Sequence, residues 1–385
     1  MQSPHYDLIV IGAGALGSFH AYHAASRKLK VLLLEKDYQP QEATVRNFGQ
    51  VVPSGKSRGR WQHYGIRSQE IYTSLQARFD ISVRQQGSVY IASDETELIL
   101  LNELRDINRK EGYHSMLLRQ ADCLERYPGL KADYCKGALL FPEEITVEPA
   151  VMIHRLIAYM REQLNVTYQP HTLVTFCDYV NGKCIAEDSL GRAYTSNKII
   201  ICNGRDFRQL FPEVFYASDI EVSKLQMMRT VPQPGYTLKG SILTGLSIRR
   251  YESFRECPSY DALKASEIPA SFREWGIHIL FKQAIDGSII IGDSHEYADA
   301  RDQDRLGFET NQAINDIIIE EAKRIFDLPS WQIAACWNGY YSQSKSHDVF
   351  RKEVADNIHV VTAIGGKGMT GSAGLAEESI AGMFS

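Results

Sequence analysis

Three features are scarce in this sequence: long apolar runs, an excess of basic residues, and paired cysteines. No apolar run approaches the roughly 20 residues that a helix needs to cross a membrane, so we predict no membrane span. The 42 basic and 47 acidic residues leave a net charge of −5, which argues against a nucleic-acid partner. The seven cysteines form no CxxC pair, which favours inert, reduced thiols, a cytoplasmic setting and no metal site.

The first apolar stretch, in MQSPHYDLIVIGAG, has no basic residues before it and runs directly into glycines. That pattern is not typical of a secretion signal. Hydrophobic residues make up 44% of the chain and charged residues 23%, which are ordinary values for a globular protein with a sizeable core. The composition therefore predicts a folded protein of one large domain or two interlocked ones.

Residue periodicity predicts where helices and strands lie. A strand at 7–11, a helix at 14–27 and a strand at 30–35 open the chain, and the middle, from about 221 to 298, reads mainly as β-structure. The remaining predicted elements are helices at 94–111, 149–163 and 310–326, strands near 166–176, 183–187, 198–202, 225–230, 277–283, 288–292 and 358–363, a glycine-rich turn at 365–374 and a helix at 375–383.

Nucleotide-type signals lie at the start, near 170–205 and at the very end of the chain, with the β-rich part between them. We therefore predict an α/β fold in which a discontinuous FAD/NAD(P)-binding Rossmann-like domain carries an inserted mixed β-sheet substrate domain. The expected cofactor-binding domain comprises residues 1–85, 145–220 and 335–385, and the substrate-binding domain comprises residues 86–144 and 221–334.

The strongest motif is Ile11-Gly12-Ala13-Gly14-Ala15-Leu16-Gly17, a GxGxxG sequence directly after a strand. Gly12 permits the tight turn, Gly14 lets the backbone approach a pyrophosphate, and Gly17 lets the helix pack closely on the strand. Glu35, with Lys36 beside it, ends the second strand, where a carboxylate accepts hydrogen bonds from ribose hydroxyls. The motif predicts a dinucleotide site but does not choose between FAD and NAD. Its predicted cofactor residues are Ile11, Gly12, Gly14, Ala15, Leu16, Gly17, Glu35 and Lys36.

Three later segments favour FAD. The loop at 44–49 is able to line a pyrophosphate or a flavin ring, although an ordinary surface turn is the alternative. A strand around Val174 and the strand end at 202–204 are placed to flank the adenine half. Glycines at 365–371 before the last helix bring N–H dipoles and a lysine towards an anionic part of a flavin, unless they form only a flexible loop. The residues predicted to bind FAD here are Arg46, Asn47, Phe48, Gly49, Val174, Cys202, Asn203, Gly204, Gly366, Lys367, Gly368, Met369 and Thr370.

The chain resembles the superfamily of FAD enzymes that includes glycine oxidase, D-amino-acid oxidase and monomeric sarcosine oxidase. The resemblance runs, in order, through DLIVIGAGALGS, VRNFG, the stretch from LERYPGL to GALLFPEEITVEPAVMIHRL, IIICNG and HVVTAIGGKGMTGSAG. It implies bound FAD, a substrate domain covering the isoalloxazine ring, and oxidation of a small primary or secondary amine by hydride transfer to flavin N5. It also implies oxygen as the electron acceptor, and an oligomer remains open.

A narrower resemblance lies in KLQMMRT, SIRRYESF and IGDSHEY, which are similar to a subgroup associated with phosphonate metabolism. That similarity implies an aminophosphonate substrate. Amino-acid oxidases of the superfamily often carry Trp-x-Gly-x-Arg, whose arginine holds the substrate carboxylate, whereas this chain has Trp337-Asn338-Gly339-Tyr340-Tyr341. Tyr341 in the arginine position makes an ordinary α-amino acid a poor fit, unless its carboxylate is held elsewhere. Cys336 is out of register with the cysteine that holds flavin in sarcosine oxidases, so we predict noncovalent FAD.

The candidate catalytic residues are His295, Tyr341, Lys367 and Arg249. His295 is placed to help deprotonate the substrate ammonium or bind an anionic tail, and Lys367 to stabilise negative charge on the flavin. Arg249 and Arg250 are expected on opposite sides of a strand, so that one of them binds the anion. Further candidates, each with a plain surface or core interpretation beside it, are Arg229, Arg46, Tyr340, His278 and Lys282.

Two alternatives to a simple amine oxidase or dehydrogenase stay open. One is a sarcosine- or glycine-oxidase-like amino acid oxidase or demethylase, which would yield formaldehyde from an N-methyl substrate. The other is a flavin-binding partner subunit without turnover of its own. A dehydrogenase that uses NAD alone is disfavoured, because the 365–371 segment would then have no ligand.

Overall fold

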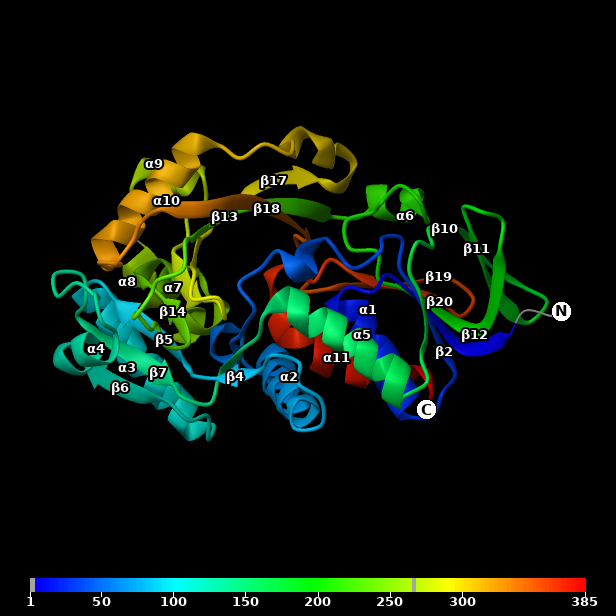
Figure 1. Ribbon diagram of the computed structural model, residues 1–385, viewed down its shortest axis with the longest axis horizontal. Helices are drawn as coiled ribbons and strands as arrows, with labels where there is room; N and C mark the ends of the chain where they lie inside the picture. The colour runs from blue at the N-terminus through cyan, green and yellow to red at the C-terminus, as the bar shows by residue number, and fades with distance from the viewer. Residues whose placement is uncertain (1–3, 265–267) are drawn as a thin grey trace.

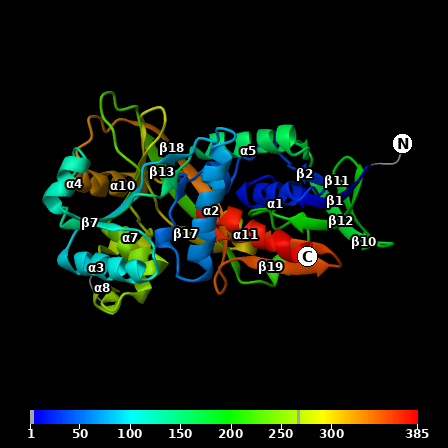
Figure 2. The ribbon, with the colours of Figure 1, turned by 90° about the horizontal axis from the view of Figure 1, so that it is seen from below.

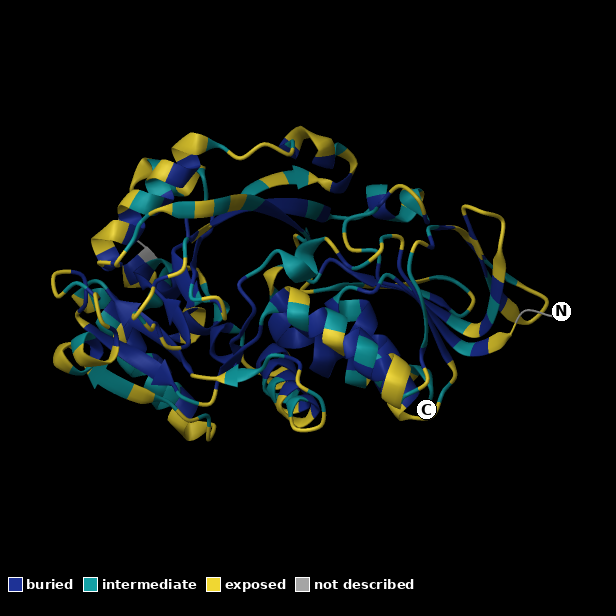
Figure 3. Ribbon diagram, in the orientation of Figure 1, coloured by how far each residue is buried: buried dark blue, intermediate teal, exposed yellow. Residues whose placement is uncertain are grey.

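The computed structural model describes residues 4–264 and 268–385, and these form two large β-sheets with helices around them (Figure 1). The first sheet occupies one half of the elongated molecule and the second sheet the other half. Buried residues concentrate on the strands and on the helix faces that cover them, while hairpin tips and outer helix faces are exposed (Figure 3). Each sheet therefore has its own core.

The first sheet has eight strands, and its centre is a parallel unit in the order β9-β2-β1-β12-β20. Strands β1 and β2 flank helix α1, as the opening β-turn-α-β pattern predicts. The parallel strands are β1 (His5–Ile11), β2 (Val31–Leu34), β9 (Thr167–Gln169), β12 (Ala193–Ile201) and β20 (Ile358–Thr362), and antiparallel β10 (Val174–Val180), β11 (Lys183–Asp188) and β19 (Phe350–Ala355) extend the sheet.

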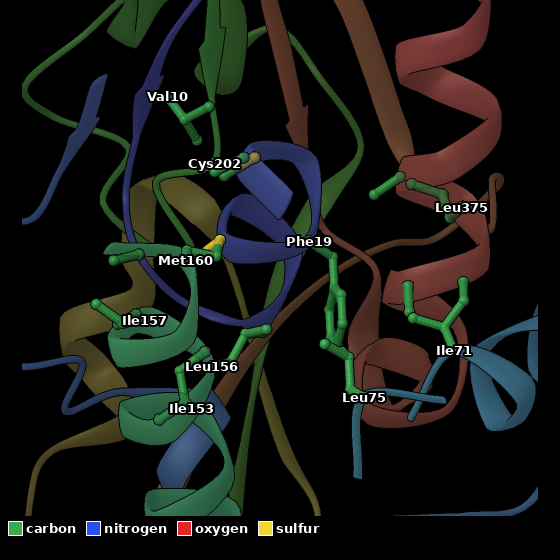
Figure 4. Close-up of a cluster of buried hydrophobic side chains, with 14 of the residues drawn as sticks. Val10, Phe19, Ile71, Leu75, Ile153, Leu156, Ile157, Met160, Cys202 and Leu375 are labelled. Atoms are coloured by element: carbon green, nitrogen blue, oxygen red, sulfur yellow. The ribbon is translucent and has the colours of Figure 1, made fainter. Parts of the chain in front are cut away.

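Four long helices cover one face of this sheet and come from distant parts of the chain: α1 (Ala15–Ser26), α2 (Arg60–Gln76), α5 (Pro149–Gln163) and α11 (Gly368–Met383). Phe19 of α1, Leu75 of α2 and Leu156 of α5 lie in one buried cluster (Figure 4). Helix α11 packs against both α1 and α2, and α2 crosses it in the view from below (Figure 2). The first and last segments of the chain are thus parts of one domain, held together by burial of apolar surface.

The second sheet has nine strands and mixes parallel and antiparallel pairs. Its strands are β5 (Ser88–Ala92), β6 (Met116–Arg119), β7 (Gly137–Phe141), β13 (Ile220–Thr230), β14 (Ser241–Leu243), β15 (Leu280–Gln283), β16 (Ile289–Gly292), β17 (Glu296–Asp299) and β18 (Ile333–Ser344). Its helices are α3 (Glu95–Lys110), α4 (Gln120–Arg126), α7 (Gly245–Arg250), α8 (Tyr260–Lys264), α9 (Ala270–Glu274) and α10 (Gln312–Ile325). A small third sheet of β3 (Gln50–Val51), β4 (Arg84–Gln85) and β8 (Ile145–Thr146), together with α6 (Pro212–Tyr216), completes the fold.

Several predictions from periodicity are corrected by the structure. β18 pairs with β13 along its length, so residues 335–344 belong to the second sheet and not to the cofactor domain. Helix α11 begins at Gly368, so most of the predicted glycine turn at 365–374 is helical. Arg249 and Arg250 lie at the end of helix α7 and not in a strand. The described residues contain no helix that is both long enough and apolar enough to cross a membrane.

Candidate active site

A cavity of about 850 Å³ lies between the two sheets, at the carboxyl ends of strands β1 and β12. In open α/β sheets this is the edge where ligands bind. The first sheet contributes the glycine loop and residues after β12, and the second sheet contributes Leu225 of β13 and Tyr341 of β18. Residues 43–56 and the start of α11 complete the walls.

The three glycines of the loop have three different geometries. Gly12 has a φ of +97°, and a Cβ built there would lie 2.3 Å from the Cys202 carbonyl oxygen. A Cβ on Gly17 would lie 2.0 Å from the Gly12 carbonyl oxygen, so helix α1 packs against the turn itself. A Cβ built on Gly14 would have one protein atom within 4 Å, Thr44 Oγ1, at a distance of 3.1 Å. Gly14 therefore borders open cavity, as expected of a position that faces a phosphate.

Glu35 holds the loop from behind. Its carboxylate accepts hydrogen bonds from the Ala13 N–H at 2.9 Å and the Asp37 N–H at 3.1 Å. Burial raises the pKa of Glu35, while these N–H groups act in the opposite direction. Lys36 points to Asp37, with Nζ 2.6 Å from its carboxylate. Neither Glu35 nor Lys36 lines the cavity, so the predicted ribose contact would lie at its edge.

Most of the predicted cofactor residues come together on the cavity wall. The residues that do so are Gly14, Ala15, Leu16, Gly17, Asn47, Phe48, Cys202, Gly204, Gly366, Lys367, Gly368, Met369 and Thr370. The remaining ones, which do not line the cavity, are Ile11, Gly12, Glu35, Lys36, Arg46, Gly49, Val174 and Asn203. Among them, the Arg46 guanidinium donates to the backbone carbonyls of Gln41 and Asn338. These hydrogen bonds stabilise the loop and hold the guanidinium away from the cavity.

The cavity is chemically suited to FAD. Four polar side-chain atoms on its lining residues have no hydrogen-bond partner among the described residues: Gln50 Nε2, Ser223 Oγ, Asp293 Oδ1 and Ser372 Oγ. Buried polar groups of folded proteins are normally paired, so such atoms mark places where a polar ligand would supply the partner. The open space beside Gly14 and the start of α11 add backbone N–H groups on two sides.

On the second-sheet side, a buried carboxylate lies between two imidazoles. The Asp293 carboxylate is 3.3 Å from His278 Nδ1 and 3.7 Å from His295 Nδ1, and all three residues line the cavity. His278 Nε2 also lies 2.8 Å from Ser247 Oγ, so both of its ring nitrogens have neighbours. The nearby histidines and Arg250 lower the pKa of Asp293 against the effect of its burial. Asp293 therefore carries a negative charge.

His295 is held as a neutral acceptor. Its Nδ1 lies 3.0 Å from the Gly276 carbonyl oxygen, which only accepts, so Nδ1 carries the proton and Nε2 carries the lone pair. Burial, with the charge of Arg250, lowers the pKa of His295 to about 3. The described residues provide no partner for Nε2. A ligand N–H is the group that this nitrogen would bind.

Two other predicted catalytic residues are already paired within the protein. Arg249 makes ion pairs with Glu97, at 2.8 Å, and Asp94, at 2.9 Å, which ties α7 to the start of α3. This pairing argues against Arg249 as the substrate's anion ligand, although it lines the cavity. Lys367 pairs with Asp348 at 2.5 Å and Glu252 at 3.0 Å, so its charge is shared before any flavin is considered.

Tyr341 is in the cavity, and its hydroxyl donates to the Arg46 carbonyl at 3.3 Å. Burial raises its pKa, so it remains a neutral phenol. Tyr340 points elsewhere and donates to the Gly307 carbonyl. Alternation along the strand correctly separated these two tyrosines. His278 lines the cavity, whereas Lys282 is bonded to the Val147 carbonyl and lies outside it.

Sequence reasoning missed Lys56, Tyr251, Glu252 and Asp293 as lining residues. Asp293 lies in the same GDSHEY segment as His295, and a carboxylate two residues from a candidate histidine was a usable signal. Lys56 and Tyr251 lie 195 residues apart in loops, and only the tertiary fold brings them to one wall.

The fold and cavity define a class: a dinucleotide-binding oxidoreductase with a second sheet over the cofactor site. The family model described as FAD dependent oxidoreductase matches residues 7–381, and the chain belongs to that family. It is therefore an FAD-dependent oxidoreductase. The predicted membership of this family is confirmed, without support for the phosphonate-associated subgroup.

Curated relatives are distant. One of the subunits of opine oxidase from Rhizobium meliloti is 22% identical over 92% of this chain and 84% of its own length. Monomeric sarcosine oxidase of Bacillus sp. is 23% identical over 53% of this chain and 52% of its own length. Glycine oxidase of Bacillus subtilis is 22% identical over 54% and 57%, respectively.

Solved structures agree on the fold. L-proline dehydrogenase from P. horikoshii superimposes with a TM-score of 0.79 at 16% identity, covering 98% of this chain and 93% of that one. Glycine oxidase from Geobacillus kaustophilus gives 0.77 at 16% identity, with coverages of 98% and 94%. The predicted fold class, a Rossmann-like domain with a mixed-sheet substrate domain, is confirmed.

Proposed function

We propose that the protein oxidises a small zwitterionic amine whose anionic group is not an α-carboxylate, with an aminophosphonate as the leading candidate. The observation that carries the proposal is the neutral acceptor His295 beside the charged Asp293, in the same cavity as the glycine loop. An amine nitrogen is the ligand group that suits both a lone pair and a nearby negative charge.

When bound, FAD supplies a two-electron acceptor for a hydride from the carbon next to the amine nitrogen. The task of the protein is to bind and orient the amine in its neutral form. A group with a pKa of about 3 accepts a hydrogen bond but does not retain a proton near neutral pH. His295 therefore orients the amine through Nε2, and the ammonium proton leaves to cavity water. This refines its role from a proton-accepting base to an orienting acceptor.

Tyr341 favours this substrate class over ordinary amino acids. A neutral phenol donates one hydrogen bond to an anion but does not neutralise its charge. Its hydroxyl is also engaged with the Arg46 carbonyl. A substrate carboxylate next to the reacting carbon would find no cation from Tyr341, whereas a tail further from the nitrogen reaches other parts of the cavity.

An N-methyl amine is a second candidate, favoured by the similarity to relatives named sarcosine oxidase. A role as one member of a larger enzyme is the third possibility, because one similar protein is named as a subunit of an opine oxidase. Formaldehyde release would identify demethylation. Turnover by the purified single chain would exclude the third possibility.

The test is anaerobic mixing of purified yellow protein with 2-aminoethylphosphonate, N-methyl-2-aminoethylphosphonate, sarcosine, glycine and D-alanine. We expect bleaching of the flavin absorbance by the aminophosphonates at lower concentration than by the α-amino acids, and hydrogen peroxide on admission of air. Preferred bleaching by an α-amino acid would contradict the substrate class, and no bleaching by any amine would contradict the function.

We also propose that the FAD is held noncovalently. Cys202 is the cysteine that lines the cavity in the described part of the chain, and burial raises its pKa, so its thiol is a poor nucleophile. Cys336 is exposed on β18 and does not line the cavity. Acid precipitation is expected to leave the flavin in the supernatant, and a yellow pellet would contradict the proposal.

A further inference from the structure

The cations that line the cavity differ in their partners. Arg249 and Lys367 have carboxylates within 3.0 Å, and Lys345 lies 2.5 Å from Asp299. The described residues place no carboxylate within 4 Å of the half-buried Lys56, and they provide no hydrogen-bond partner for its ammonium group. Glu252 and Glu144 attract its charge from further away and Lys367 repels it, but Glu252 is itself paired with Lys367 at 3.0 Å. Its closest aromatic neighbour is Tyr251, with Nζ 5.8 Å from the ring centroid. A cation partly removed from water without a counter-ion is costly unless a ligand pairs with it.

The backbone before Lys56 is held in place by buried contacts. The preceding 3₁₀ turn, Pro53–Gly55, is held by the fully buried Glu144, which accepts from the Ser54 N–H at 2.8 Å and the Tyr113 hydroxyl at 2.9 Å. A Cβ on Gly55 would lie 2.5 Å from the Tyr251 ring, so the backbone rests directly on that tyrosine. The turn that presents Lys56 is therefore fixed against the cavity wall.

Tyr251 lies near both Lys56 and the Asp293 cluster. Lys56 Nζ lies 5.8 Å from the centre of its ring, and the His278 ring, next to Asp293, lies 5.5 Å from it. Arg250 and Arg255, which also line the cavity and have no carboxylate within 4 Å among the described residues, are both exposed. Arg250 donates to the Tyr297 hydroxyl at 3.3 Å and lowers the pKa of Asp293 and of His295. The wall thus offers a negative site beside the amine acceptor and a separate positive site.

We infer that Lys56 binds the anionic tail of the substrate and supplies the positive charge that is absent at Tyr341. This inference rests on the proposed function, because it takes the Asp293 and His295 side as the amine site. It predicts that the substrate carries its anion at a distance from the nitrogen, as in an ω-aminophosphonate or an ω-amino acid. Tyr251 then fills the space beneath the carbon chain between the two charged groups.

The experiment compares binding with and without the tail in the flavin-loaded protein. Dissociation constants for 2-aminoethylphosphonate, β-alanine and propylamine come from the concentration dependence of anaerobic bleaching, and that of methylphosphonate comes from the change in flavin absorbance. We expect Lys56→Gln to weaken the three anions by about tenfold to a hundredfold, the usual effect of losing a hydrogen bond to a charged group, and propylamine less than twofold. Lys183→Gln, in the distant β11, is the charge-matched control.

A conservative variant and a pH series separate binding from folding. Burial lowers the pKa of Lys56 to about 8, so the affinity of the wild type for methylphosphonate should fall above pH 8 as the ammonium deprotonates. Lys56→Arg should keep the anion affinity and remove this fall, because guanidinium stays charged. Equal weakening of propylamine and the anions by Lys56→Gln would overturn the inference, as would full anion affinity in Lys56→Gln with loss in Arg250→Gln.

Failure of the proposed function gives a different result. If methylphosphonate binds in a Lys56-dependent manner but no amine bleaches the flavin, the anion site stands and the amine chemistry is wrong. If amines bleach the flavin but none of the anions depends on Lys56, the amine chemistry stands and the anion site is wrong.

Discussion

At the scale of single residues, identical residue types have separate tasks set by their surroundings. Gly12 requires glycine for its positive φ, Gly17 for close packing, and Gly14 for space that the protein itself leaves open. Arg249 and Arg250 are neighbours in sequence, yet one is committed to carboxylates and the other is exposed. The sequence motif predicted the turn at Gly12 and the close packing at Gly17, because phosphate loops impose this geometry locally, and the phosphate contact at Gly14 stays a prediction.

Gly14→Val should separate flavin binding from folding. Gly14 has a φ of −62°, which any residue adopts, and only Thr44 Oγ1 lies near its Cβ position. We expect the apoprotein to keep its melting temperature within a few degrees while the ratio of flavin to protein absorbance falls at least about tenfold, because the valine blocks close phosphate approach.

Gly17→Ala is the contrasting control. Its Cβ would overlap the Gly12 carbonyl at 2.0 Å, so this variant should lose folded protein even without flavin. Full flavin content in Gly14→Val would show that the phosphate lies elsewhere.

His295 should affect the rate of flavin reduction, but its own ionisation should not make that rate depend on pH. Its pKa of about 3 leaves it neutral throughout pH 5–8, so the pH dependence there belongs to the substrate ammonium. We expect His295→Phe to slow anaerobic flavin reduction by about 10²-fold, at the low end of proton-transfer and orientation effects. His295→Gln should recover most of the rate, because an amide oxygen also accepts a hydrogen bond.

Stopped-flow reduction over pH 5–9 measures both effects, and His63→Gln, on the exposed face of α2, is the control. If the wild type shows a limb near pH 6.5 that His295→Gln removes, His295 titrates in catalysis and the orienting role is wrong.

At the scale of elements, α7 depends on a buried ion pair. The Glu97 side chain is only 1% exposed and also accepts from the Ser93 N–H and hydroxyl, so loss of Arg249 would leave a buried charge uncompensated. Arg249→Met should lower the free energy of unfolding by about 3 kcal/mol.

Its neighbour provides the control, since Arg250→Met, at an exposed position, should change the free energy of unfolding by less than about 0.5 kcal/mol. Adding Glu97→Gln to Arg249→Met should restore part of the loss. Urea denaturation of the three variants gives these free energies. A stable Arg249→Met variant with a raised Kd for methylphosphonate would contradict this structural role and indicate that Arg249 binds the anion.

The elements also show where sequence patterns are informative. Helices α3, α5 and α10 lie within two residues of their predicted ends, because long amphipathic patterns and start signals are local properties. Helix α11 was predicted to start too late, because glycines read as a turn when their burial against α2 is unknown. Arg249 was placed in a strand because a short segment carries too little periodicity to separate helix from strand.

At the scale of the whole molecule, the discontinuous cofactor domain follows from matching segments at both ends of the chain. The cavity wall of Lys56, Tyr251 and Asp293 does not, because it forms where three separate loops meet. Sequence reasoning therefore predicted the side of the site that one motif encodes. It missed much of the side that the tertiary fold assembles.

Acid stability is a property of the whole molecule that the buried histidines predict. Burial lowers the pKa of His20 and His23 to about 4 and that of His295 to about 3, so these three side chains bind up to three more protons in the unfolded chain as the pH falls below 6.5. The folded state then loses stability. Glu144 acts in the opposite direction, because burial raises its pKa to about 7 and the folded state holds its proton between pH 4.5 and 7.

The net difference from these four groups near pH 5.5 is about two protons, so they should raise the free energy of unfolding by about 2.7 kcal/mol per pH unit between pH 5 and 6. Urea denaturation at several pH values measures this slope. His20→Gln removes one of the three histidines, and the slope should fall by about one proton, or about 1.4 kcal/mol per pH unit. His63→Gln, an exposed histidine, should leave the slope unchanged. An unchanged slope in His20→Gln would mean that His20 is protonated in the folded protein, against the effect expected from its complete burial.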